Sequence, residues 1–114
     1  MADVVYLVND LFFVARIEET AAQLGVTVER ARDPEALAAV ATAARLVLLD
    51  LRLRDALDAL DRLRALAPDV RSVGFIDHEN VDAMEAASAH GCRTVVSKRK
   101  FASALPELLA ASRG

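Results

Sequence analysis

Short runs rich in β-branched and aliphatic residues alternate with longer runs rich in alanine and leucine along the whole chain. The runs that read as strands are Val4–Val8, Thr27–Arg30, Leu46–Leu49, Ser72–Ile76 and Thr94–Ser97. The runs that read as helices are Leu11–Leu24, Pro34–Ala44, Ala56–Leu66, Val81–His90 and Ala102–Ser112. Capping residues support these helix assignments. Gly25 and Gly91 follow two of the helices, as C-terminal caps do, and Asp33 precedes Pro34, as an N-cap does. The alternation predicts an α/β fold of consecutive βα units.

The connections between these units are short, which implies a parallel sheet with helices on both faces. Val4–Val8 and Leu46–Leu49 are almost wholly apolar, as central strands are, whereas Thr27–Arg30 is more polar and fits an edge. Right-handed crossovers then favour the strand order 2-1-3-4-5. We therefore expect a doubly wound (βα)5 three-layer sandwich of the flavodoxin-like type. The 114 residues are enough for one such domain, which we place over residues 1–114.

Composition narrows the class of protein. The formal net charge of −3 does not suggest a nucleic-acid partner, which would favour a basic face. The single cysteine, Cys92, cannot form an internal disulfide, and this fits a reducing compartment. The first residues lack the pattern of a signal peptide, and no run approaches the ~20 apolar residues of a membrane helix. We expect a soluble, cytoplasmic protein with no membrane partner.

Polar residues stand where two apolar strands end. Asn9 and Asp10 follow the first strand, and Asp50 follows the third. Since the carboxyl ends of strands 1 and 3 meet at the switch point of this topology, we expect the two acids to be neighbours. Two carboxylates at one rim repel each other unless a cation intervenes, and Mg²⁺ is the hard cation that such oxygens favour. Lys98 follows the fifth strand and is long enough to reach back, so the sequence predicts a phosphoryl site with Asp50 as the nucleophile.

Simpler interpretations of the same residues remain open. Asp50 can end its strand by accepting bonds from nearby backbone amides. Asn9 and Asp10 can cap the first helix, a role that is compatible with metal binding. Lys98 can be a solvated surface lysine.

Three large apolar residues, Leu11-Phe12-Phe13, start the first helix. One helix face cannot bury all three, so we expect one of them to be exposed near the rim of the site. That residue is either a single exposed apolar side chain beside the core, with no binding role, or a docking site for a partner.

The segments "YLVND", "LVLLDLRLRD" and "GCRTVVSK" together resemble the receiver domain of two-component response regulators, and the resemblance covers the full length. It implies that Asp50 accepts phosphate from a histidine kinase and that Lys98 pairs with the phosphoryl oxygens. It also implies a Mg²⁺ ion held by Asp10 and Asp50, by Asn9 through water, and by the backbone carbonyl of Arg52. The partner would be the kinase or a downstream effector protein. A homodimer would use the face formed by the fourth helix, fifth strand and fifth helix.

The chain departs from the receiver pattern at several places. Asn9 replaces the first acid. Ile76, followed by Asp77, stands where the family has a serine or threonine that binds the phosphoryl group and carries the switch. Val95 stands at the aromatic switch position, and Arg99 replaces the proline after the lysine. An isoleucine cannot donate a hydrogen bond, so the relay that reports phosphorylation is missing two of its parts.

Three functions follow from these observations. The first is a stand-alone receiver-like signalling module with a Mg²⁺-dependent phosphoacceptor at Asp50 and output through protein–protein interaction. The second is a pseudo-receiver that docks proteins independently of phosphorylation. The third, a small enzyme or cofactor binder, is disfavoured because no glycine-rich nucleotide loop follows the first strand, so we do not expect an enzyme.

Overall fold

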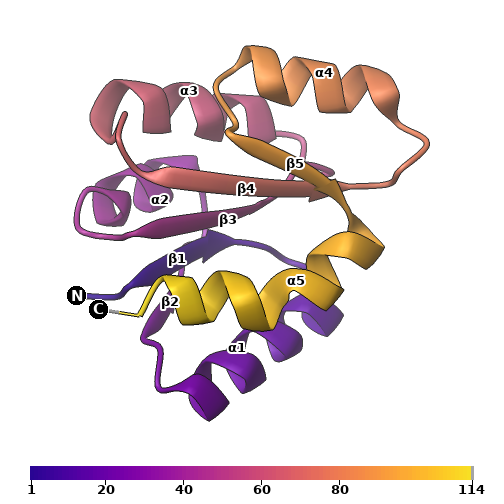
Figure 1. The fold of residues 1–114 in the computed structure, drawn as a ribbon. Helices are drawn as coiled ribbons and strands as arrows, with labels where there is room; N and C mark the ends of the chain where they lie inside the picture. The colour runs from indigo at the N-terminus through magenta and orange to yellow at the C-terminus, as the bar shows by residue number, and fades with distance from the viewer. Residues whose placement is uncertain (114) are drawn as a thin grey trace.

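A computed structural model describes residues 1–113 and shows a parallel five-stranded sheet between two layers of helices (Figure 1). The strands are β1 (Val4–Leu7), β2 (Val28–Arg30), β3 (Leu46–Asp50), β4 (Arg71–Ile76) and β5 (Thr94–Ser97). The helices are α1 (Leu11–Leu24), α2 (Pro34–Ala41), α3 (Ala56–Leu66), α4 (Val81–Ala89) and α5 (Lys98–Ala111). The strand order is β2-β1-β3-β4-β5, so the predicted fold class and topology are confirmed.

The core lies on both faces of the central strands. Every residue of β1 and β3 is buried, whereas β2 is mostly exposed, as predicted for two central strands and an edge. Alternate residues point to opposite faces: Val5 and Leu7 pack with the α2, α3 and α4 layer, whereas Val4 and Tyr6 pack with α1 and α5. Figure 1 shows α1 and α5 together on one side of the sheet and the other three helices on the opposite side.

Most element boundaries agree with the sequence prediction to within a few residues, but the last helix begins earlier. It starts at Lys98, directly after β5, and not at Ala102. The Ser97 hydroxyl accepts a hydrogen bond from the Lys100 backbone N–H at 3.1 Å and so caps the helix. The lysine predicted to reach the site is therefore the first residue of α5.

The described helices, over residues 1–113, are all too short or too polar to cross a membrane.

The central strand β3 supplies a test of the packing. Leu48 is completely buried, so Leu48→Ala should lower the free energy of unfolding by about 2–5 kcal/mol through lost burial and the cavity left behind. The measurement is urea unfolding followed by circular dichroism. Leu66→Ala is the matched control, because Leu66 is 59% exposed and its truncation should change stability by no more than about 0.5 kcal/mol. Equal losses in the two variants would contradict the placement of β3.

Candidate functional site: an acid pair closed by an arginine

Asp50 is the last residue of β3, and its side chain is only 4% exposed. Its Oδ1 accepts hydrogen bonds from the backbone N–H of Arg52 and from Nε–H of the same residue, both at 2.9 Å. Its Oδ2 accepts from Arg52 Nη2 at 2.8 Å. A buried carboxylate is costly unless it is paired, and this two-point ion pair supplies the compensation. Part of the simpler interpretation also holds, since one donor is a local backbone amide.

The same guanidinium reaches the second acid. Arg52 Nη2 donates to Asp10 Oδ2 at 3.1 Å, so one nitrogen bridges the carboxylate that follows β1 and the carboxylate that ends β3. Asp10 is also the N-cap of α1, and its Oδ1 accepts from the Phe12 backbone N–H at 2.9 Å. The structure therefore brings Asp10 and Asp50 to one site, with Arg52 between them.

Aromatic rings lie beneath the guanidinium. Its central carbon is 5.8 Å from the ring centroid of Phe13 and 5.7 Å from that of Phe75, within the range of cation–π attraction. The two rings lie 4.7 Å apart, and Phe75 stacks on Phe101 at 4.2 Å. The arginine is thus held from below by apolar surface and from the side by two acids.

These contacts fix the charges of the site. The hydrogen bond with Asp50 is the main reason that the pKa of Arg52 is raised above its usual value. The hydrogen bond from Arg52 is likewise the main reason that the pKa of Asp10 is lowered. Near neutral pH the bridge therefore joins a guanidinium cation to the Asp10 anion, with the Asp50 carboxylate as its second acceptor.

Lys98 does not reach Asp50. Its ammonium pairs with Asp77 Oδ1 at 2.7 Å, and both side chains are about half-exposed. This bond is the main cause of a lowered pKa for Asp77, and a smaller contribution comes from Arg52, which places Asp77 near the same rim. The sheet register explains the pairing, because Ile76 lies opposite Ser97 and the residues that follow β4 and β5 are therefore neighbours.

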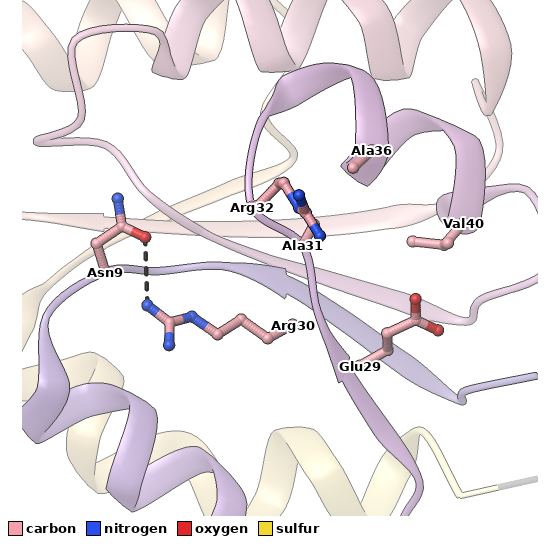
Figure 2. A pocket seen from close by; sticks show the side chains of 7 residues that line it. All are labelled: Asn9, Glu29, Arg30, Ala31, Arg32, Ala36 and Val40. Carbon is pink, nitrogen blue, oxygen red and sulfur yellow. Dashed lines mark hydrogen bonds between the residues drawn. The ribbon is translucent and has the colours of Figure 1, made fainter.

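Asn9 lies apart from the two acids, and Ile76 supplies no polar group to the site, as predicted. Figure 2 shows Asn9 turned toward Arg30, whose Nη2 donates to Asn9 Oδ1 at 3.4 Å. Both residues line a hollow of about 460 Å³ beside β2 and α2, with Arg32 and Ala36 on its other side. Ile76 is 2% exposed and packs in the core on the side of the sheet that carries α2, α3 and α4, so it presents no polar group to the rim.

The set of residues expected to hold magnesium does not fit a divalent cation in this arrangement. Each carboxylate oxygen of Asp10 and Asp50 already accepts a hydrogen bond from the protein. Within residues 1–113, no three His, Cys, Asp or Glu side chains gather so that they could hold a metal ion. An ion between the acids would first have to displace Arg52.

The start of α1 exposes more apolar surface than the sequence predicts. Phe13 is buried, but both Leu11 and Phe12 are exposed, at 74% and 59%. The Arg16 guanidinium lies over the Phe12 ring, 5.8 Å from its centroid. Two large apolar side chains, and not one, therefore flank Asp10 at the rim.

Sequence reasoning assigned Arg52 a backbone carbonyl for the metal and considered its side chain only as part of a phosphate-attracting rim or a solvated face, so it missed the pairing with the acids. The signal was present in "LLDLR", where an arginine follows the strand-ending acid by two positions. What the sequence did not give is the direction of that side chain, which depends on the rings beneath it.

Neither a protein-family model nor a curated protein matches this sequence. Solved structures do. The receiver domain of NtrX from Brucella abortus matches with a TM-score of 0.78 and 22% identity over 96% of this chain and 97% of that one. A CheY-like response regulator receiver domain protein from Methanospirillum hungatei JF-1 matches with a TM-score of 0.74 and 16% identity, over 96% and 94%.

A structure of NtrX from Brucella abortus in complex with ADP matches with a TM-score of 0.79 and 25% identity. That match covers 97% of this chain but only 26% of that one. The chain therefore has the fold of a response regulator receiver domain, which confirms the resemblance predicted from the sequence. The match spans 97% of the isolated NtrX receiver domain and about a quarter of the longer NtrX chain.

The Arg52 bridge can be tested by a double-mutant cycle. Arg52→Ala should lower the free energy of unfolding by roughly 2–4 kcal/mol, because it leaves the buried Asp50 with only a backbone donor. Asp50→Asn combined with Arg52→Ala should cost less than the sum of the two single changes, by about 1–3 kcal/mol. Urea unfolding of the four proteins gives these values. Strict additivity would show that the pair does not interact.

Proposed function

We propose that this protein is a receiver-type signalling module that binds a protein partner while Asp50 stays unmodified. The observation that carries the proposal is the Lys98–Asp77 ion pair at 2.7 Å. The lysine that would stabilise a phosphoryl group on Asp50 is engaged by another acid, and α5 begins at that lysine.

The charge balance of the rim supports the same conclusion. A phosphoryl group adds about two negative charges and several acceptor oxygens. Here it would stand beside Asp10 and near Asp77, with Arg52 already shared between two carboxylates. Ile76 has no hydroxyl that could donate a hydrogen bond to a phosphoryl oxygen. The arrangement favours an unmodified Asp50.

The exposed apolar pair at the start of α1 is the docking surface that we propose. Leu11 and Phe12 project beside Asp10, and an exposed aromatic side chain flanked by polar groups is a frequent energetic centre of protein interfaces. The homodimer through α4, β5 and α5 that the resemblance implies stays a prediction.

A phosphoryl donor tests the proposal directly. Incubation with Mg²⁺ and acetyl phosphate should leave the mass of the intact protein unchanged, because neither Lys98 nor a hydroxyl at position 76 is available to the incoming group. Mass spectrometry at neutral pH reads the outcome. A gain of one phosphate that disappears in Asp50→Asn would overturn the proposal. A receiver domain known to be phosphorylated serves as the positive control.

A second test separates docking from phosphorylation in cells. Phe12→Ala should abolish the function of the protein, while Asp50→Asn, which keeps the shape of the side chain, should retain it. The readout is complementation of a deletion strain, with protein abundance measured in parallel. Loss of function in a folded, equally abundant Asp50→Asn variant would contradict the proposal.

The second candidate is a phosphoacceptor at Asp50, and the exposure of Arg52 favours it. The arginine side chain is 29% exposed, so it can rotate toward solvent and open the acid pair. This candidate includes transfer from a histidine kinase and the magnesium ion implied by the resemblance, and it requires Arg52 to leave first. The acetyl phosphate experiment decides between the two candidates.

A further inference from the structure

We propose that the Arg52 guanidinium is the resident cation of the acid pair and that it excludes a divalent metal ion from the wild-type chain. The inference rests on the proposed function in one respect, since it takes Asp50 as an unmodified carboxylate. It goes further by assigning a role to a side chain that the receiver resemblance leaves without one.

The geometry carries the first step. Arg52 Nη2 lies 2.8 Å from Asp50 Oδ2 and 3.1 Å from Asp10 Oδ2. A divalent ion shared by the two acids would need these same oxygens at about 2.0–2.1 Å for Mg²⁺. The nitrogen stands between the oxygens that such an ion would bridge, so the nitrogen and the ion exclude each other.

The second step is that this cation is well held. Arg52 makes three hydrogen bonds to Asp50, counting its backbone N–H, and its guanidinium lies over the rings of Phe13 and Phe75. A guanidinium is weakly hydrated and loses little on leaving water, whereas Mg²⁺ gives up its water reluctantly. Because the arginine is part of the chain, it also loses no translational freedom on binding.

The third step concerns the charge left behind. With Arg52 in place the two acids and the guanidinium carry a net charge of about −1, and without it two like charges face each other across one gap. A cation bound from solution would reduce the repulsion between the two carboxylates. Removing the side chain should therefore create a divalent-ion site that the wild-type protein lacks.

The experiment is a titration with Mn²⁺, followed by water-proton relaxation, and with Mg²⁺, followed by calorimetry. Arg52→Ala should bind one ion at least about tenfold more tightly than the wild type. Arg54→Ala is the matched control, because it removes an exposed arginine from the same loop and should bind as the wild type does. The double variant Asp50→Asn with Arg52→Ala should lose the gain.

Wild-type affinity equal to that of Arg52→Ala would overturn the inference, as would a folded Arg52→Ala variant that gains nothing. If Arg52→Ala does not fold, Arg52→Gln takes its place. The wild type supplies an independent readout. The chemical shift of the Arg52 Nε–H should not change in ~10 mM Mg²⁺, a concentration above the dissociation constants of weak carboxylate sites. Displacement of that signal would refute the inference.

The two proposals fail separately. A wild-type chain that binds no Mg²⁺ but takes up phosphate on Asp50 would refute the proposed function and leave the resident cation standing. A wild-type chain that binds Mg²⁺ between the acids but takes up no phosphate would do the reverse.

Discussion

The ion pair between Asp50 and Arg52 is the interaction on which the functional end of this molecule depends. A carboxylate at the end of a fully buried strand needs a partner, and the loop that follows β3 turns its own arginine back to supply one. The same guanidinium binds Asp10, the cap of α1, so a single side chain connects the ends of β1 and β3 with the start of a helix.

A second ion pair organises the neighbouring part of the rim. Asp77 follows β4 and Lys98 begins α5. Their ion pair links the loop after β4 to the start of α5. The carboxyl edge of the sheet thus carries two ion-paired clusters, one of Asp10, Arg52 and Asp50 and one of Asp77 and Lys98. Lys98, which the resemblance assigns to phosphate chemistry, and Arg52, to whose side chain it assigns no role, here neutralise the acids of the protein itself.

The aromatic cluster explains why the arginine lies where it does. Phe13 from α1 and Phe75 from β4 meet beneath it, and Phe101 from α5 completes the stack. These rings belong to the core between the sheet and the α1–α5 layer, so the position of Arg52 is set by the packing of three separate elements. The exposed Leu11 and Phe12 lie on the outer side of the same helix start and remain available to a partner.

The sequence determined the fold, because hydrophobic periodicity and helix caps act over a few residues. The apolar runs at Val4–Val8 and Leu46–Leu49 identified the central strands, and the topology that follows from them placed Asp10 near Asp50. Which charges pair between distant segments was decided only by the tertiary structure. The register of β4 against β5 sets Lys98 beside Asp77, and the rings of Phe13 and Phe75 lie beneath the Arg52 side chain that binds the acids. Both choices depend on residues far apart in the chain, to which no local pattern refers.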